Sequence, residues 1–208
     1  MSSHAHNHPG HQPDIEDHPL TWHMALTEAV TELLLARSMF TPDELRRTLE
    51  IMDIRSPADG ARLVARAWVD TGFRERLLAD VNLAALELGI DAGGIPIRAI
   101  ANEPGTHNVI VCTLSSCYPR LLLGPSPDWY KARAYRSRVV REPRTVLAEF
   151  GLELPPGQAV VVHDSTAELR YLVLPERPSG TEGWSEDALA AIVTRDCLIG
   201  TALPRTDH

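Results

Sequence analysis

Two cysteines five positions apart are the residues of this chain best suited to chemistry. Cys112 and Cys117 enclose Thr-Leu-Ser-Ser and follow a run of β-branched residues that predicts a strand. Thiolates are soft ligands for transition metals, so the pair could form half of a zinc site. The same spacing fits two small buried hydrophobic residues. Both interpretations stay open, because the third cysteine, Cys197, lies far along the chain in an apolar run typical of a buried side chain.

Length and composition exclude several classes of protein. The 208 residues are 44% hydrophobic and 23% charged, which excludes disordered chains, collagen and coiled coils. The 20 basic residues against 28 acidic ones give a net charge of −8, the wrong sign for binding nucleic acid. No apolar run approaches the roughly 18 residues that span a membrane, and the N-terminus has no signal-peptide pattern. We therefore expect a cytoplasmic protein without nucleic-acid or membrane partners.

The first twenty residues differ in composition from the rest of the chain. Residues 1–20 hold five of the nine histidines and three prolines, with almost no apolar bulk. Such a segment cannot bury enough surface to offset the entropy of ordering it, so we predict a disordered His-rich leader. It could bind a divalent ion or be a solvated tail.

Residues 21–92 show the periodicity of helices. The apolar stripe that begins at Trp22 predicts one helix to about Arg37, and Thr41, Pro42 and Glu44 form a capping-box pattern that begins a second helix. A third helix is expected after Ser56 and Pro57. The spacing of Leu77, Val81, Ala84 and Leu88 predicts a fourth helix that ends at Gly89.

Residues 93–208 have a mixed pattern. The predicted strands cover 95–100, 108–112, 159–163 and 168–174, with a turn at 164–165 between the last two. The Pro-rich segment 119–127 is predicted to be a loop, residues 135–150 a helix broken near Pro143, and residues 185–193 a last short helix capped by Ser185. The predicted fold class is α+β, with an N-terminal helical region followed by an irregular α+β domain that carries the cysteine pair.

The segment around the cysteine pair resembles the metal-binding motif of the nitrile hydratase alpha subunit, V-C-(T/S)-L-C-S-C. Val111, Cys112, Thr113, Leu114, Ser116 and Cys117 match it in order. Other blocks that resemble this subunit include GARLVARAWVDTGFRERLLAD at 60–80, PDWYK at 127–131, RPSGTEGWSE at 177–186 and VTRDCLIG at 193–200. Together the blocks cover about residues 25–203. Thiocyanate hydrolase, whose metal subunit has the same fold, is the related family to distinguish.

The resemblance implies a claw-shaped metal site. In that family three cysteine sulfurs and two backbone nitrogens hold trivalent cobalt or iron, and an open position lets the ion act as a Lewis acid toward a nitrile. The implied metal ligands here are the Cys112 and Cys117 sulfurs, the side chain at position 115, and the backbone nitrogens of Ser116 and Cys117. Cys117 would carry the sulfenic acid that attacks the nitrile carbon. Thr113, where iron-containing members tend to have Ser, favours cobalt over iron.

Ser115 departs from the motif at the catalytic and metal-ligating position where the family has its central cysteine. A hydroxyl is a far poorer donor than a thiolate to a trivalent transition metal, and it cannot form a sulfinic acid. An engineered substitution, a natural variant and a misread modified residue are the three explanations. We expect weak metal retention and reduced turnover.

The implied function is that of a lyase subunit that hydrates a nitrile to its amide. The resemblance also implies a heteromer with one or two beta-subunit chains, whose arginines bind the oxidised sulfurs, a small nitrile substrate and a metallochaperone or activator. A catalytically silent structural subunit and a thiocyanate hydrolase-like subunit are the alternatives. Arg120 stands where the family often has Trp, so it either makes the pocket wall more polar or is a solvated surface residue. Arg170 is expected near the oxidised sulfurs or in a salt bridge, and His107 in a structural role.

Overall fold

The computed structural model describes residues 22–115 and 117–206 and divides into two compact units. The first unit ends at Ile54 and the second begins at Arg55. The predicted leader at residues 1–20 lies outside the described residues. The predicted boundary between the helical region and the α+β domain, between residues 92 and 93, falls inside the second unit.

The described residues of the first unit, 22–54, contain the helices α1 (Trp22–Ala36) and α2 (Pro42–Asp53). The predicted capping box of α2 is confirmed: Thr41 Oγ1 accepts a hydrogen bond from the Glu44 amide at 3.2 Å, and the Glu44 carboxylate accepts one from the Thr41 amide at 2.7 Å. Neither helix has a buried residue. The apolar stripe predicted on α1 is therefore exposed, with Trp22 71% accessible.

Three helices begin the second unit: α3 (Ala58–Val69), α4 (Thr71–Ala79) and α5 (Val81–Glu87). The prediction of a single helix over residues 77–88 was wrong, because Asp80 interrupts it. The Asp80 side chain accepts a hydrogen bond from the Leu83 amide at 3.0 Å and so begins a new helix. The apolar periodicity continues across this break, since Leu77, Val81 and Ala84 all face the core.

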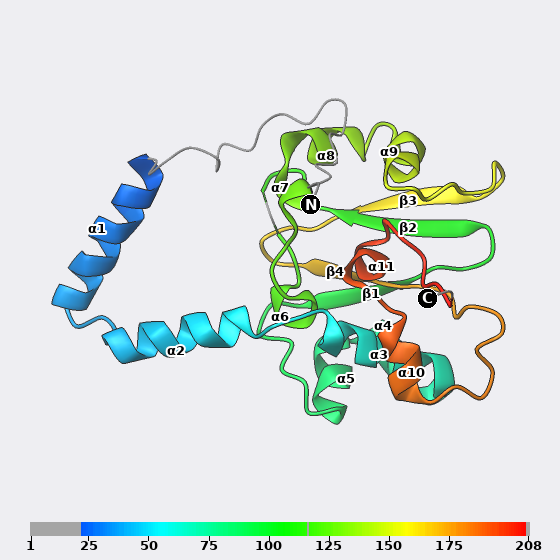
Figure 1. Ribbon diagram of the computed structural model, residues 1–208, viewed down its shortest axis with the longest axis horizontal. Helices are drawn as coiled ribbons and strands as arrows, with labels where there is room; N and C mark the ends of the chain where they lie inside the picture. The colour runs from blue at the N-terminus through cyan, green and yellow to red at the C-terminus, as the bar shows by residue number, and fades with distance from the viewer. Residues whose placement is uncertain (1–21, 116, 207–208) are drawn as a thin grey trace, which may run out of the picture. The chain divides into compact units, whose positions relative to one another are not determined.

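The four strands found in the described residues form two parallel pairs in the middle of the second unit (Figure 1). β1 (Ile97–Ala101) pairs with β4 (Arg170–Leu174), and β2 (Thr106–Val111) pairs with β3 (Ala159–Asp164). Asp164 is the last residue of β3 and Ser165 follows it, and the two residues do not form a turn between paired strands, because β3 pairs with β2 and β4 with β1. Val111, the last residue of β2, lies beside Asp164, the last residue of β3. This register brings the residues after both strands together.

Short helices surround the strands. α6 (Arg120–Leu123) lies within the segment predicted to be a loop, and that prediction was wrong because Leu122 and Leu123 are fully buried and anchor a helical turn. The predicted break near Pro143 is confirmed. The remaining helices are α7 (Asp128–Lys131), α8 (Arg133–Arg138), α9 (Pro143–Glu149), α10 (Glu186–Ala191) and α11 (Arg195–Ile199).

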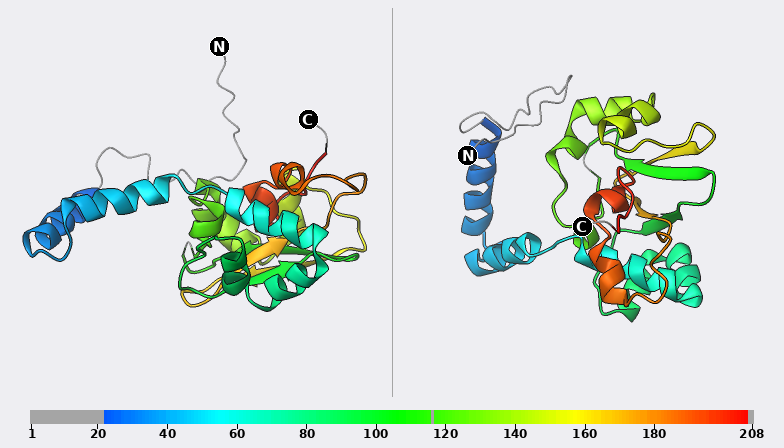
Figure 2. Two further views of the ribbon diagram at one scale, coloured as in Figure 1. Left: turned by 90° about the horizontal axis from the view of Figure 1, so that it is seen from below. Right: turned by 45° about the vertical axis from the view of Figure 1, so that its right-hand side comes forward.

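The helices α7 to α9 lie beyond β3, whereas α3 and α5 lie beyond β1 (Figure 1). Ser185 caps α10 as predicted, accepting from the Ala188 amide at 3.2 Å. The helix α11 was not predicted; it packs on β2 and β4, on the same side of the strands as α10 in the left view of Figure 2. The predicted α+β class is confirmed.

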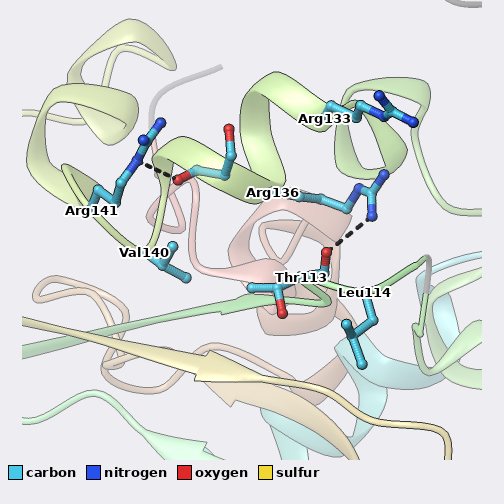
Figure 3. A pocket seen from close by; sticks show the side chains of 7 residues that line it. Thr113, Leu114, Arg133, Arg136, Val140 and Arg141 are labelled. Atoms are coloured by element: carbon cyan, nitrogen blue, oxygen red, sulfur yellow. Dashed lines mark hydrogen bonds between the residues drawn. The ribbon is translucent and has the colours of Figure 1, made fainter.

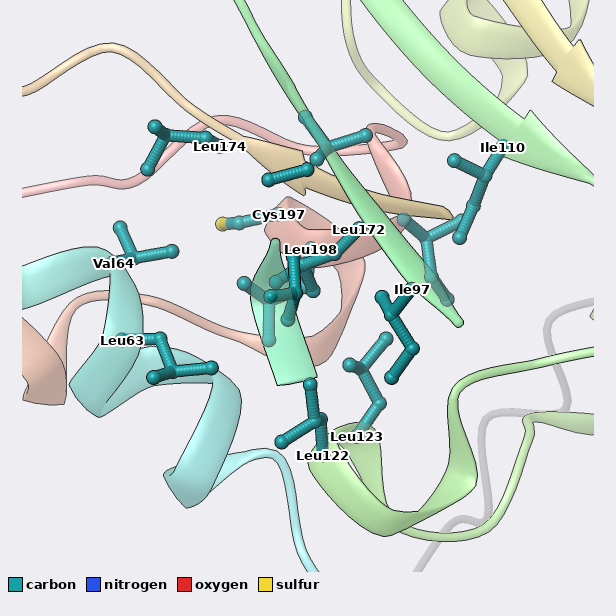
Figure 4. Close-up of a cluster of buried hydrophobic side chains, with 14 of the residues drawn as sticks. Leu63, Val64, Ile97, Ile110, Leu122, Leu123, Leu172, Leu174, Cys197 and Leu198 are labelled. Carbon is teal, nitrogen blue, oxygen red and sulfur yellow. The ribbon is translucent and has the colours of Figure 1, made fainter. Parts of the chain in front are cut away.

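The core of the second unit lies between α3, α6, α11 and the strands (Figure 4). Leu63 and Val64 from α3 meet side chains of β4 and α11 there, including Leu172 and Leu198. Cys197 is 1% exposed, which confirms that it is a buried side chain rather than part of the cysteine pair. This core fixes the strands whose ends carry the site.

Replacing Gly200 by alanine should destabilise the second unit by about 2–4 kcal/mol. Gly200 ends α11 with a φ of 92°, and an added Cβ would overlap the Asn108 carbonyl oxygen. The matched control is Gly151→Ala, where φ is 81° but nothing lies within 4 Å, so that only the backbone cost of about 1 kcal/mol is expected. Urea unfolding measures both, and equal losses would contradict this account.

Candidate metal centre

The residues from Cys112 to Cys117, here named the claw loop, directly follow β2. The Ser115 Oγ lies 3.7 Å from the Cys112 Sγ and 3.5 Å from the Cys117 Sγ, and the Ser115 amide donates to the Cys112 Sγ at 3.3 Å. Cys112 is buried and Cys117 is half-buried. The structure thus brings three of the predicted ligand residues together, whereas Ser116 lies outside the described residues.

Thr113 is held through all of its polar atoms. The Asp164 carboxylate accepts hydrogen bonds from the Thr113 amide at 2.9 Å and from its hydroxyl at 2.6 Å. The Arg136 guanidinium donates to the Thr113 carbonyl oxygen at 3.1 Å. Because Asp164 ends β3 beside the end of β2, strand pairing places this carboxylate next to the start of the claw loop.

Two buried tyrosines hold the backbone just before the claw loop and at its last residue. Tyr135 donates to the carbonyl oxygen of Ile110 at 2.7 Å, and Tyr130 donates to that of Cys117 at 3.1 Å. Burial raises the pKa of both phenols, so they remain hydrogen-bond donors. Trp129 packs against Tyr135 and Phe150 with ring centroids 4.9 and 4.6 Å away. These aromatic residues form a rigid support behind the site.

The hydrogen bonds within the claw loop favour the thiolate of Cys112. Burial opposes ionisation of this thiol, but hydrogen bonds from Cys117 and Ser115 outweigh burial and lower its pKa. A thiolate is the form of cysteine that binds metals. The buried Cys197 behaves in the opposite way, since burial raises the pKa of its thiol.

The placement of the claw-loop side chains fits a metal ion, and two of the three side-chain donors are sulfurs. Ser115 is the exception, because its hydroxyl replaces a thiol. Within residues 22–115 and 117–206, no three His, Cys, Asp or Glu side chains gather into a possible metal site. Neither His107 nor His163 therefore completes the closed zinc site that the Cys112–Cys117 spacing left open.

His107 has the structural role predicted for it. Its Nε2 lies 2.7 Å from the Gly200 carbonyl oxygen, and its Nδ1 lies 3.2 Å from the Asn102 side-chain nitrogen. A carbonyl can only accept and an amide nitrogen can only donate, so the ring is neutral with its proton on Nε2. His163 reaches the same polar cluster through a 2.8 Å contact with the Asn108 Oδ1.

In the described part of the chain, neither of the two arginines singled out in the sequence forms a hydrogen bond to the Cys112 or Cys117 sulfur. Arg120 is exposed at the start of α6. Arg170 begins β4, and its Nη1 is buried without a hydrogen-bond partner in the described part of the chain. No salt bridge of Arg170 is found among those residues, so the predicted ion pair does not form there. Asp164, Arg136 and Tyr130 support the claw loop, and sequence reasoning assigned none of them that role.

Comparison with known proteins identifies the family. The family model for the nitrile hydratase alpha chain matches residues 22–202. The chain is 44% identical to the thiocyanate hydrolase subunit gamma of Thiobacillus thioparus, over 86% of this chain and 79% of that protein. It is 45% identical to the low-molecular weight cobalt-containing nitrile hydratase subunit alpha of Rhodococcus rhodochrous, over 88% and 89% of the two chains.

A solved structure gives the same result. A double mutant of the Fe-type nitrile hydratase from Comamonas testosteroni Ni1 superposes with a TM-score of 0.80 at 40% identity, covering 88% of this chain and 90% of that chain. The chain therefore belongs to the nitrile hydratase alpha-chain family, which confirms the predicted resemblance and fold. None of the helices in the described residues is long and apolar enough to cross a membrane.

Replacing Asp164 by asparagine should loosen the claw loop and lower the free energy of unfolding by about 1–3 kcal/mol. The amide has one acceptor oxygen for the two donors of Thr113 and loses the negative charge. Thr113→Val is the matched variant, because it keeps the backbone hydrogen bond and should cost only about 1 kcal/mol. Urea unfolding gives the free energies, and amide hydrogen exchange reports the loop. An asparagine variant as stable and protected as the wild type would contradict this role.

The buried His107 should make the protein less stable in weak acid. Burial lowers the pKa of His107 below its usual 6.5, so the unfolded chain takes up this proton more readily than the folded protein does. Its contribution is therefore complete above the unfolded pKa and is lost as the pH falls toward the folded pKa. Unfolding free energies measured from about pH 7 to about pH 5 should decrease more steeply for the wild type than for His107→Gln. Identical slopes would exclude this contribution.

Proposed function

We propose that this chain is the metal-binding alpha subunit of a nitrile hydratase, which hydrates a nitrile to the corresponding amide together with a partner subunit. The observation that supports this most directly is the position of the Ser115 Oγ, which lies 3.7 Å from the Cys112 Sγ and 3.5 Å from the Cys117 Sγ on a loop held by Asp164, Arg136 and Tyr130. Membership in the nitrile hydratase alpha-chain family supports the reaction class.

The proposed metal is cobalt(III), with iron(III) as the alternative. Relatives of both kinds support this, one described as cobalt-containing and another as Fe-type. The proposed ligands are the Cys112 and Cys117 sulfurs, the Ser115 hydroxyl, and the backbone nitrogens of Ser116 and Cys117. When bound, such an ion would supply a Lewis acid that polarises a nitrile.

Different residues of the chain would have different roles around such an ion. Cys112 is buried and would serve as a ligand only, whereas the half-buried Cys117 can meet a substrate and would provide the nucleophilic sulfur as a sulfenic acid. Tyr130 would hold the Cys117 carbonyl, and Asp164 the first turn of the loop. These contacts would hold the loop backbone that carries the sulfurs, and they are not made to the sulfur atoms themselves.

We propose that Ser115 weakens metal retention and turnover. Its hydroxyl occupies the position of a third sulfur but is a poorer donor to a trivalent ion. If the loss is complete, the chain is a catalytically silent subunit that keeps the fold. The 44% identity to a thiocyanate hydrolase gamma subunit favours thiocyanate as the second candidate substrate.

The proposed assembly is a heteromer in the cytoplasm. The partner would be a beta subunit of one or two chains, and a metallochaperone or activator would load the metal.

Restoring the missing sulfur tests this proposal. Wild type, Ser115→Cys and Ser115→Ala, each co-expressed with the beta subunit in cobalt medium, should differ in cobalt content: nearly stoichiometric for the cysteine variant, less for the wild type and least for the alanine variant. Elemental analysis measures the metal, and mass spectrometry of Cys117 measures sulfur oxidation. Nitrile and thiocyanate turnover should follow the metal content.

The outcomes separate the claims. Tightly held cobalt and full turnover in the wild type would show that Ser115 does not impair the site. Absence of cobalt from all three proteins would contradict the metal-subunit proposal itself. Turnover of thiocyanate alone would favour the second candidate substrate.

A further inference from the structure

The two ends of the claw loop are held in different ways. At its start, the Arg136 guanidinium donates to the Thr113 carbonyl oxygen (Figure 3). At its end, only two residues, Tyr118 and Pro119, separate Cys117 from α6. The position of α6 therefore bears directly on the position of the Cys117 sulfur.

Backbone hydrogen bonds make α6 and the two residues before it one compact turn. The Arg120 amide donates to the Tyr118 carbonyl oxygen at 2.8 Å. The amides of Leu122 and Leu123 both donate to the Pro119 carbonyl oxygen, at 3.0 and 3.1 Å. A helix of one turn is not stable on its own in water, so packing must fix its position. Leu122 and Leu123 supply part of that packing, because both side chains are fully buried in the core (Figure 4).

Gly60 brings the backbone of α3 close to α6. A Cβ atom built on Gly60 would lie 3.1 Å from the Leu122 carbonyl oxygen and 2.8 Å from the Leu198 Cδ1. The backbone of Gly60 is helical, so its conformation does not require glycine, and glycine is a poorer helix former than alanine. The close approach of α6 therefore explains this glycine, and the needs of α3 itself do not.

Gly124 closes the other end of α6. It has a φ of 72°, and a Cβ there would lie 2.7 Å from the Arg55 carbonyl oxygen. Its amide donates to the Arg120 carbonyl oxygen at 2.9 Å. Glycine is thus required both for the backbone conformation and for the close contact. A side chain at position 60 or 124 would push α6 away from the backbone on which it packs.

We infer that Gly60 and Gly124 are positioning residues for Cys117, which act by letting α6 pack directly on the backbone of two other segments. The inference rests on the proposed function, in which the Cys117 sulfur is a metal ligand and the nucleophile. Tyr130 donates to the Cys117 carbonyl oxygen at 3.1 Å, so a displaced α6 would also strain this hydrogen bond.

A small displacement of α6 is enough to affect the sulfur. A Cβ at position 60 requires the Leu122 carbonyl group to move by a few tenths of an ångström, because this group is backbone, whereas the Leu198 Cδ1 is the end of a flexible side chain. Moving a reacting group by about 1 Å can cost about 100-fold in rate, so a few tenths of this distance should cost about three- to tenfold.

Alanine substitutions test the inference in the chain co-expressed with the beta subunit in cobalt medium. Gly60→Ala should lower the cobalt content and the oxidised fraction of Cys117 about three- to tenfold, and Gly124→Ala should lower both further. The matched controls are Gly94→Ala, for an open position, and Gly89→Ala, for a positive φ of 68°, since a Cβ at either glycine has nothing within 4 Å. Both controls should match the wild type.

Amide hydrogen exchange of the full chain prepared without metal separates positioning from a general loss of stability. In Gly60→Ala the amides of Leu122, Leu123 and Gly124 should exchange faster than in the wild type, because their hydrogen bonds lie within the displaced turn. The amides of β1 and β4 should exchange as in the wild type. A general destabilisation would instead speed the exchange of all these amides together.

A second substitution identifies the contact that is responsible. Leu198→Val removes the Cδ1 atom that a Cβ at position 60 would meet, but it leaves the Leu122 carbonyl group in place. Gly60→Ala/Leu198→Val should therefore keep the loss of cobalt, with Leu198→Val alone as its control. Recovery of the wild-type cobalt content in the double variant would overturn the inference and assign Gly60 to packing of the core.

The other outcomes decide the inference as well. Wild-type cobalt content, Cys117 oxidation and amide exchange in Gly60→Ala would overturn it and leave the proposed function standing, and so would an equal loss in Gly94→Ala. If Gly124→Ala does not fold, Gly60→Ala alone decides. If none of the proteins takes up cobalt, the wild type included, the proposed function fails. Exchange of the α6 amides then still tests the glycines, and unaltered exchange in Gly60→Ala overturns their positioning role.

Discussion

The geometry of the claw loop depends on the pair of hydrogen bonds between the Asp164 carboxylate and Thr113. These bonds exist because β2 and β3 run parallel and end side by side, which puts Asp164 next to Val111. A parallel pair gathers the polar residues that follow both strands at one edge. The remaining supports, Arg136, Tyr130 and Tyr135, come from α7 and α8, so a strand and two helices distant in the chain together hold the described residues of the claw loop.

Local features of the fold could be predicted from the sequence, and partnerships between distant segments could not. The capping residues Thr41 and Ser185 act within one helical turn, so they identified helix starts correctly. Asp80 shows why apolar periodicity does not predict every helix boundary. It is a polar residue on the exposed side, so the apolar spacing continues past it although the helix ends there. The pairing of β1 with β4 and of β2 with β3 is set by tertiary packing, for which no single segment carries a signal.

In the candidate site, too, the local residues could be predicted and the contacts from distant segments could not. Residue types and the family resemblance identified Cys112, Ser115 and Cys117, which lie together. Asp164 and Arg136 were missed as supports because they come from segments far along the chain. One signal was available for Asp164: it follows a β-branched run, as Cys112 does, and polar residues after two strands gather when those strands are parallel neighbours. The local electrostatics follow the same contacts, since Ser115 and Cys117 stabilise the Cys112 thiolate by hydrogen bonding.

The pairing of strands so distant in the chain also sets an order of events during synthesis. β2 and the claw loop leave the ribosome before residues 118–158, which separate the loop from β3. At typical elongation rates this interval lasts about 2–10 s. During that time Cys112 and Cys117 are attached to a strand that lacks its partner, and Asp164 has not been made. The thiols are thus chemically accessible before β3 and Asp164, which support the claw loop, have been made. The ordered loop therefore forms late in folding. A metal ion bound earlier would bind to a flexible peptide.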